Sequence, residues 1–570
     1  MRLSWLPVRQ NAHLHDPVIT DISEWPIAKL DSNREAFINE LVEITYSNML
    51  KRSREKGTSI NSIIANAVYY ERMRIKKDPW KIDPKDERKW WKDIKKQLVQ
   101  ASIERPDSKN LPSENLEKEL LKKIIYRYSD EIVGNFHQWY YRLVSNLFPV
   151  VFTAMLNVFV GRKRERYFGD KRMLKMWEKM KITGPIEKIQ TLSKTHTIVL
   201  LPTHFSNLDS LVVGWAIQTI GLPAFNYGAG LNLLNVRFFA HFISKLGAYK
   251  VDRRKKNAIY LKVLKEYSIL ALTKGVHSLF FPGGTRSRSG AIESKLKLGL
   301  LSTLFDAQRI NLENNNPKKI IVLPMTINYQ FVLEAQSLIH EHLKNSGKEK
   351  YFIEHDEMND SLRIIKFIIK FIKAESDMSI SYGDPMDIFG NYVDEEGKSI
   401  NDKGEAIDIA NYFKEEDKIT TNNPRDSKYT QALCDTLVKE YLRINTVMPG
   451  HILAYTAFEL LIKTTQLDLF ELLRFPEREL EINYTEYLGY FQKVKNKLIG
   501  LNKDGRVGLC DEFEGDSHEL IVRGLRNCGL YNSKRPLRKN KNGNLVTQNL
   551  NSLYYYHNRL LGYDLEHIFN

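Results

Sequence analysis

The chain has 570 residues, of which 42% are hydrophobic and 27% charged. This is the composition of a folded globular protein with two or three domains, and it excludes a disordered chain. The formal net charge of +16 predicts an anionic partner, which could be a nucleic acid, an anionic membrane surface or a phosphorylated substrate.

Cysteine is scarce, and none of the three residues (Cys434, Cys510 and Cys528) forms a Cys-x-x-Cys pair. This usage excludes a disulfide scaffold and a cysteine-rich zinc site, and it favours a reducing compartment. Residues 1–10 contain no apolar segment of signal-peptide length. We therefore expect the protein to lie on the cytoplasmic side.

The first 140 residues are predicted to form a charged, helical N-terminal region. Apolar residues recur at helical spacing in Asn33–Lys51, and Arg88–Leu98 is a basic segment that carries Trp90 and Trp91. We find no residues with an obvious chemical role there, and a solvated or surface-docking region is expected.

Leu143–Gly161 carries no charge and is flanked by Arg142 and Arg162. As a helix it would be about 28 Å long, which barely matches the hydrocarbon thickness of a bilayer. Its polar residues fall on one side of the helical wheel, and Pro149 predicts a kink. The pattern favours an interfacial or re-entrant membrane helix over a clean span. A helix buried in the protein core is the alternative.

The pattern then changes to short apolar runs that alternate with helical segments. The β-like runs are Thr197–Leu201, Ala224–Tyr227, Ala248–Asp252, Val276–Phe281 and Lys319–Ile327, and the helical patterns are Leu208–Ile220, Val236–Leu246, Ile259–Leu272 and Leu296–Gln308. Such alternation predicts an α/β domain, which we place at residues 141–394, with a mostly parallel sheet flanked by helices.

Two later segments complete the predicted organisation. Leu362–Lys373 combines a wide apolar arc with a thin basic stripe, which is typical of an interfacial membrane helix or of a core helix with a solvated edge. Glu395–Asp426 is polar and resembles a linker. Helical patterns return afterwards, as in Leu433–Asn445 and Ile452–Ile462, so residues 395–570 are expected to be a linker and a helical C-terminal domain.

The first candidate site residues follow the run Thr197–Leu201. His204 stands where a parallel strand should end, which is where α/β folds place their sites. Asp209 begins the next predicted helix, so its carboxylate can fold back onto the imidazole, fix its tautomer and stabilise the imidazolium. Taken alone, a His–Asp pair at this spacing is weak evidence, because strand ends often carry an ordinary histidine.

A second candidate follows the run Leu279–Phe281. Pro282–Gly290 contains glycines, including Gly284, whose backbone N–H groups could approach an anion, together with hydroxyls such as that of Thr285. Arg286 and Arg288 are two residues apart and would project to the same side of an extended segment. Two guanidinium groups beside a glycine loop predict a phosphate clamp, with a basic surface turn as the alternative.

These two motifs together resemble the glycerolipid acyltransferase superfamily. Gly247–Arg253 and Ile321–Ile327 resemble two further blocks of that family, in the right order and at similar spacing. The resemblance implies that Arg253 helps to bind the acceptor phosphate and that Pro324 shapes the acyl side of the site. It covers about residues 190–390.

Further segments resemble the glycerol-3-phosphate acyltransferase branch: Ser289–Glu293, Lys297–Leu301, Asn328–Glu334 and the C-terminal Leu553–Asn558. One departure affects the acceptor site, because Gly283 stands where the family usually has a glutamate that helps to organise it. Lys250 likewise stands where an aromatic residue is common.

The resemblance implies transfer of a fatty acyl group from acyl-CoA or acyl carrier protein to the sn-1 hydroxyl of glycerol 3-phosphate, on a membrane surface and without a cofactor. His204 would be the general base and Asp209 its partner. No Gly-x-Ser-x-Gly elbow supplies a nucleophilic serine, and Ser206 is expected to support the loop. No metal site is expected, because His340–His342, the nearest approach to a ligand cluster, has the pattern of a solvated helix face.

Other functions remain open at this point. The same residues could acylate lysophosphatidate or dihydroxyacetone phosphate. The basic charge would also suit a nucleic-acid-binding protein, although no recognised nucleic-acid module is present. A membrane scaffold without activity is the third alternative, and Gly283 is the residue that raises it.

Overall fold

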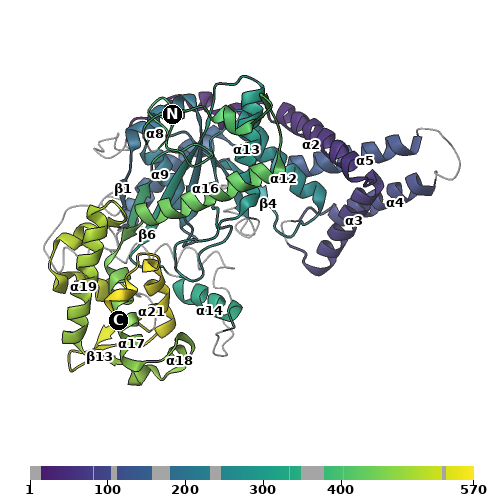
Figure 1. Cartoon of the computed structure of the whole chain (residues 1–570). Coiled ribbons are helices and arrows are strands. Elements are labelled where there is room, and N and C mark those ends of the chain that lie inside the picture. The colour runs from purple at the N-terminus through teal and green to yellow at the C-terminus, as the bar shows by residue number, and fades with distance from the viewer. Residues whose placement is uncertain are drawn as a thin grey trace.

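The computed structural model describes residues 15–80, 83–103, 112–156, 180–230, 245–332, 334–347, 378–401, 403–528 and 534–569. A central α/β body carries a set of N-terminal helices that project from one side, while the C-terminal helices gather at another side (Figure 1). The predicted fold class, an α/β core with a mostly parallel sheet and helical regions at both ends of the chain, is confirmed.

The central sheet has seven strands in the order β1-β7-β6-β2-β5-β3-β4. Their bounds are Met180–Thr183 (β1), Thr197–Pro202 (β2), Asn226–Gly230 (β3), Ala248–Val251 (β4), Ser278–Leu279 (β5), Ile320–Tyr329 (β6) and Met378–Tyr382 (β7). Strands β6, β2, β5, β3 and β4 are mutually parallel, whereas β7 is antiparallel to β6. Five strands therefore end at one edge of the sheet, and their following loops meet there.

Helices cover both faces of this sheet, and the alternation of side chains along β2 shows how. Ile198 and Leu200 pack in one apolar cluster with α8 (Ile186–Thr195) and α9 (Asp209–Thr219). Val199 and Leu201 point the other way, into a cluster with α12 (Ala258–Thr273), α13 (Leu298–Glu313) and α16 (Asn423–Ile444). The continuous apolar run of this strand is therefore explained by burial on both sides.

The N-terminal helices form a bundle with a core of its own. They are α1 (Pro26–Ser32), α2 (Arg34–Lys56), α3 (Ile60–Lys77), α4 (Glu87–Ile103) and α5 (Pro112–Ile132). Apolar side chains of α2 to α5 share one cluster with Ile259, Tyr260 and Val263 of α12. The bundle is thus packed onto the α/β body through α12, on the side of β4.

The C-terminal residues do not all form a separate unit. Helix α16 packs against α13 and β6 of the α/β body. The segment predicted as a linker contains the short strands β8 (Ser399–Ile400), β9 (Ala406–Ile407), β10 (Lys414–Glu415) and β11 (Lys418–Ile419).

The remaining C-terminal elements include α17 and the helices that pack on it. They are β12 (Thr446–Val447), α17 (Pro449–Thr465), α18 (Leu469–Arg474), β13 (Glu481–Ile482), α19 (Tyr484–Lys503), β14 (Gly508–Leu509), α20 (Ser517–Asn527), β15 (Arg538–Lys539), β16 (Leu545–Val546) and α21 (Leu550–His557). Helix α17 is buried along most of its length and contacts α19, α20 and α21.

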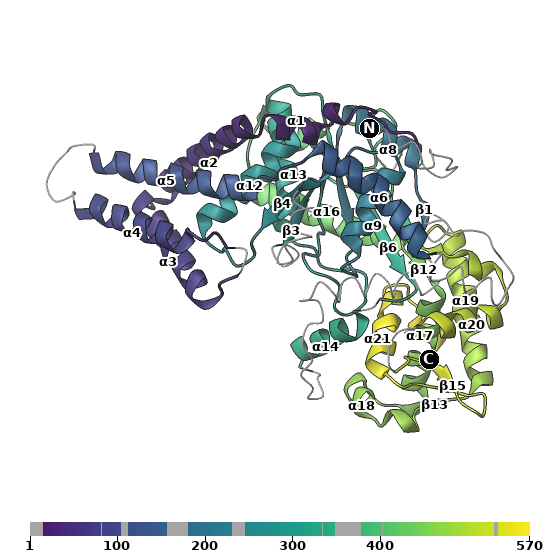
Figure 2. The same cartoon turned by 180° about the vertical axis from the view of Figure 1, so that it is seen from behind.

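Helix α6 (Gln138–Leu156) covers most of the segment for which a membrane helix was predicted, and it lies on the outside of the α/β body (Figure 2). Within the described ranges, no helix combines the length and the apolarity that a membrane crossing requires. Residues 157–161 lie outside the described residues, as do Leu362–Lys373 and most of the predicted helix Val236–Leu246.

Candidate active site

The His204–Asp209 pair stands where β2 ends and α9 begins. Strand β2 stops at Pro202, and Asp209 is the first residue of α9. The imidazole Nδ1 of His204 lies 2.8 Å from Oδ2 of Asp209. The carboxylate is fully buried, whereas the histidine side chain is 18% exposed. The predicted pairing of the two side chains is therefore present in the structure.

Two aromatic residues hold this pair in place. The ring of Phe281 stacks on the imidazole of His204 with 4.1 Å between the ring centroids. The hydroxyl of Tyr329, at the end of β6, donates a hydrogen bond to Oδ1 of Asp209. Burial, together with this carboxylate, raises the pKa of Tyr329, so the hydroxyl stays protonated. Nε2 of His204 has no hydrogen bond to any described residue and is the nitrogen that can take a proton from a bound alcohol.

The turn between β2 and α9 is held by carboxylates that bind consecutive backbone N–H groups. Glu293 accepts from the N–H of His204 at 2.8 Å. Asp209 accepts from those of Phe205 and Ser206 at 2.6 and 2.9 Å. Glu334 accepts from the N–H of residue 207 at 2.9 Å and from the Ser206 hydroxyl at 3.2 Å. Ser206 thus contacts the loop that it was predicted to support.

The glycine-containing loop after β5 lies directly against this turn. Strands β2 and β5 are neighbours, and the N–H of Ser287 donates to the carbonyl of His204 at 2.7 Å. Gly284 has a φ of +76°, a left-handed conformation that favours glycine, and its N–H donates to the carbonyl of Phe281. Thr285, which follows, is half-buried. The loop therefore turns sharply beside the imidazole.

The three arginines of the predicted phosphate clamp all belong to this edge of the sheet. Arg253, which follows β4, is exposed, and its guanidinium group donates to the carbonyl of Gly284 at 2.8 Å.

Both arginines of the loop face the helix α14 (Ala335–Asn345). Arg286 lies 3.5 Å from Glu334, which precedes that helix, and Arg288 lies 2.8 Å from Glu341 within it. Burial raises the pKa of Glu334, and Arg286 opposes that shift. Two cations are thus held on acidic partners in the loop that lies against the His204 turn.

The other residues singled out in the sequence are placed as follows. Pro324 is buried inside β6, level with Leu201 of β2. His340 contacts Asn551, and its neighbour Glu341 binds Arg288. Across the described ranges, no three His, Cys, Asp or Glu side chains gather into a group that could hold a metal ion.

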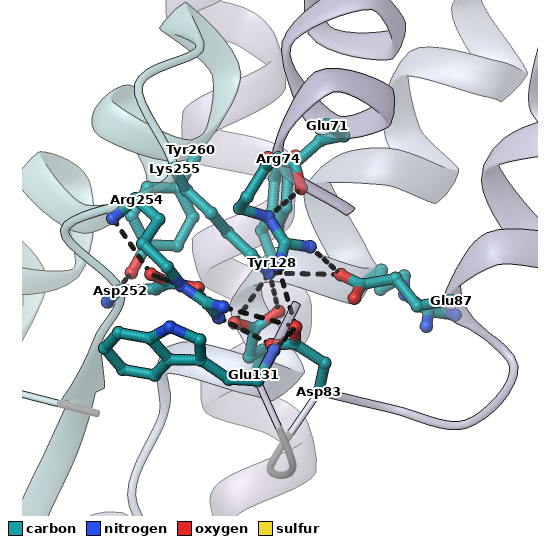
Figure 3. A network of polar contacts seen from close by, with 12 residues as sticks. Glu71, Arg74, Asp83, Glu87, Tyr128, Glu131, Asp252, Arg254, Lys255 and Tyr260 are labelled. Carbon is teal, nitrogen blue, oxygen red and sulfur yellow. Dashed lines mark hydrogen bonds and ion pairs between the residues drawn. The ribbon is translucent and has the colours of Figure 1, made fainter. Parts of the chain in front are cut away.

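The turn that carries Arg253 is anchored to the N-terminal helices by a polar network (Figure 3). Arg254 donates to Asp252 at 2.9 and 2.8 Å and to Asp83, and it lies over the ring of Trp80 with 4.1 Å to the centroid. Lys255 donates to Glu131 of α5 at 2.7 Å. Both cations are almost fully buried.

A second part of the network ties this turn to α3 and α4. Arg74 of α3 binds Glu71 at 2.8 Å, Asp83 at 3.2 Å and Glu87 at the start of α4. The side chain of Asn257, just before α12, donates to the same Glu71 at 2.8 Å. Buried charges held in this way have little freedom to move, so the N-terminal helices fix the backbone from which Arg253 projects.

Several residues of the site carried no assigned role in the sequence. Tyr329 and Glu334 lie in the block Asn328–Glu334, and Glu293 ends the block Ser289–Glu293. Both blocks resemble segments of the glycerol-3-phosphate acyltransferase branch. Only the fold shows what they contact.

Arg559 directly follows the C-terminal block Leu553–Asn558. Its guanidinium carbon lies 3.3 Å from the centroid of the Phe205 ring, and its Nη1 has no partner among the described residues. Burial lowers the pKa of Arg559 to about 10, so it remains a cation at neutral pH. The neighbouring Asn558 donates to the carbonyl of Ser289 at 2.9 Å. The C-terminal residues are therefore part of the wall behind the candidate site.

Comparison with known proteins agrees with this geometry. Residues 185–328 match the family model described as "Acyltransferase", and they contain both the His204–Asp209 turn and the arginine loop. This part of the chain is therefore similar to the acyltransferase family, as the sequence motifs predicted.

Several similar proteins are named glycerol-3-phosphate acyltransferase. One from Pseudoalteromonas atlantica is 29% identical over 235 residues, which is 40% of this chain and 27% of that protein. One from Aeromonas hydrophila subsp. hydrophila is 26% identical over 302 residues, or 53% of this chain and 33% of that protein. One from Pseudomonas paraeruginosa is 27% identical over 265 residues, which is 45% of this chain and 28% of that protein. The chain therefore matches about a third or less of the length of these relatives.

The anchored turn of this acyltransferase domain gives a first prediction. Replacing Arg254 by Met leaves Asp83 and Asp252 without their shared cation, which should lower the free energy of unfolding by about 3–5 kcal/mol. Denaturant unfolding measures that change, and hydrogen exchange of residues 252–260 should become faster. Arg523→Met removes an exposed cation that pairs with Glu519 and Glu512 at the surface of α20, and it should change the stability by less than about 1 kcal/mol. Unchanged exchange in Arg254→Met would contradict the anchoring role.

Proposed function

We propose that the protein transfers a fatty acyl group from an acyl thioester to the sn-1 hydroxyl of glycerol 3-phosphate, forming lysophosphatidate. The observation that carries the proposal is the His204 imidazole, whose Nδ1 is held by buried Asp209 while Nε2 stays free beside the arginine loop. Several similar proteins carry the name glycerol-3-phosphate acyltransferase, which favours this acceptor.

The reaction follows from the chemistry of these groups. Nε2 of His204 removes the proton of the sn-1 hydroxyl while the alcohol oxygen attacks the thioester carbonyl. The carbon–sulfur bond then breaks, and the thiolate of CoA or acyl carrier protein leaves and accepts the proton from the imidazolium. Asp209 stabilises that imidazolium, since its carboxylate is buried 2.8 Å from Nδ1. The thioester is already activated, so the scheme needs no acyl-enzyme and no cofactor.

The acceptor phosphate is assigned to the arginines at the edge of the sheet. Arg253, Arg286 and Arg288 would bind its oxygens, with the backbone of Gly284 and Thr285 lining the loop, while Pro324 belongs to the acyl side. Arg253 is exposed, and the side chain of Arg288 is 38% exposed, so both can reach a soluble phosphate ester.

The acceptor is tested directly by an acyl-transfer assay with the purified full chain. Glycerol 3-phosphate, lysophosphatidate and dihydroxyacetone phosphate are offered separately, each with acyl-CoA and with acyl carrier protein. Transfer to glycerol 3-phosphate is expected. Transfer to lysophosphatidate alone would contradict the proposed acceptor, and no transfer to any of them would favour a scaffold without activity.

Loss of the base should affect turnover and leave the fold intact. His204→Ala is expected to lower kcat at least about 100-fold, which is typical of a general base, with little change in melting temperature. The matched control is His518→Ala, because His518 is an exposed histidine on α20. Near-normal turnover in His204→Ala would exclude this mechanism.

The phosphate clamp predicts an effect on acceptor binding. Arg286→Ala should raise the KM for glycerol 3-phosphate about 10- to 100-fold, because charge-assisted hydrogen bonds to the phosphate are lost. The KM for the acyl donor should change little. Arg538→Ala, an exposed arginine on β15, serves as the control. An effect confined to the acyl donor would contradict the assignment.

We also propose that α6 docks on the cytoplasmic face of an anionic membrane. Trp139, Leu143 and Leu147 are 58%, 37% and 50% exposed, and their spacing places them on one stripe of the helix. Leu147→Glu should weaken binding to vesicles with anionic phospholipids at least about tenfold in a sedimentation assay. Val99→Glu on α4, where Val99 is 46% exposed, is the control. Equal binding of both variants would exclude α6 as the docking helix.

A further inference from the structure

The side chain of Glu293 lies between the backbone of the catalytic histidine and Gly283. Its Oε1 accepts the N–H of His204 at 2.8 Å. Its Oε2 is buried and has no hydrogen bond to another described residue. A carboxyl group in this place fixes the backbone from which the imidazole projects, because the N–H of His204 has no other acceptor in the described part of the chain.

The glycine at position 283 is explained by the nearby Glu293 side chain, which limits the room for a side chain there, and not by its backbone conformation. Its neighbour Gly284 has a left-handed φ of +76°, but Gly283 is not among the glycines with positive φ. A Cβ atom at position 283 would lie 3.0 Å from Cγ of Glu293 and 3.3 Å from its Oε1. A side chain at position 283 would therefore crowd the Glu293 side chain, which would have to shift to make room for it.

The surroundings of the Glu293 carboxyl group shift its pKa. Burial raises the pKa of Glu293 to about 7, while the hydrogen bond from the His204 N–H and the Arg559 cation oppose that rise. The His204 imidazole and the Tyr441 hydroxyl are further titratable groups that interact with the Glu293 carboxyl group. The group thus sits near the midpoint of its titration at neutral pH.

We propose that Glu293 is a positioning residue for His204, and that position 283 is glycine because the Glu293 carboxyl group fills the space beside it. This inference rests on the proposed function, since it assumes that His204 is the base. It gives Gly283 a role and removes the reason to regard this glycine as a sign of an inactive site. Glu293 acts through the histidine backbone and does not contact the acyl acceptor.

The proposal predicts that positions 283 and 293 compensate for each other. Glu293→Ala should lower kcat about 10- to 100-fold, because a displaced base loses reactivity steeply with distance, while the KM for glycerol 3-phosphate changes less than about threefold. Glu293→Gln keeps an acceptor oxygen of the same reach and should retain kcat within about fivefold. The control Glu313→Ala removes an exposed carboxylate at the end of α13 and should leave kcat unchanged.

A reciprocal exchange provides the decisive comparison. Gly283→Glu alone should lower kcat, because two side chains then occupy one volume. The double variant Gly283→Glu with Glu293→Ala supplies a carboxylate from position 283 in place of the one lost at position 293. Its kcat should be at least about tenfold higher than that of Glu293→Ala. A double variant no better than Glu293→Ala overturns the proposal, as does an effect of Glu293→Ala on the acceptor KM alone.

A stability measurement separates failure of this inference from failure of the proposed function. A carboxyl group with a raised pKa favours the protonated folded state, so its contribution to stability is present below pH 4.5 and is lost as the pH rises through about 7. The melting temperature of the unchanged protein, relative to Glu293→Gln, should therefore fall between pH 5 and about pH 8.5. If no acyl transfer occurs but this difference is seen, the buried carboxyl group stands and the function fails. If the difference in melting temperature between the unchanged protein and Glu293→Gln does not vary with pH, Glu293 is not a buried carboxyl group with a raised pKa.

Discussion

The site depends on one constraint: the backbone N–H groups of residues 204 to 207 are all bound by side-chain carboxyl groups. Glu293, Asp209 and Glu334 supply these acceptors from three parts of the chain. Hydrogen bonds of buried backbone amides are costly to break, because the freed N–H group would be left without a partner. These hydrogen bonds hold the turn, and with it the backbone of His204, in one conformation.

The parallel sheet explains why these groups meet. Strands β2, β5 and β4 end at the same edge, so the histidine turn, the arginine loop and the Arg253 turn become neighbours although they are distant in sequence. Supports come from outside the sheet as well. The N-terminal helices hold the turn after β4 through Arg254 and Lys255, and the guanidinium group of Arg559 lies over the ring of Phe205. The acyltransferase domain thus relies on both of its helical flanks.

Much of this arrangement could be predicted from the sequence, because buried strands and amphipathic helices leave clear patterns. The run Thr197–Leu201 became β2, one residue longer, and Ile259–Leu272 became α12 with one more residue at each end. Val276–Phe281 shortened to the two residues of β5, since the chain turns away into the arginine loop.

The pair His204 and Asp209 could be found because the partners are five residues apart and belong to one strand–helix junction. The role of Glu293 could not be found in this way. Its contact depends on the path of the loop after β5, 89 residues further along the chain. Arg559 is a stronger case, because an arginine in a basic chain gives no sign that it will be buried under a phenylalanine ring. Long-range burial of charge is a property of the assembled fold, and local patterns do not record it.

The ion pairs at the mouth of the site have a consequence for selectivity. Arg286 and Arg288 already have acidic partners in Glu334 and Glu341. Under the proposed function, a phosphate ester would therefore have to displace these carboxyl groups from the guanidinium groups. A doubly charged phosphate would compete well for the guanidinium groups, whereas a singly charged anion would compete poorly. An uncharged polyol has no charge with which to bind them. The acidic residues would then act as placeholders that make free glycerol a poor ligand while keeping the guanidinium groups ordered.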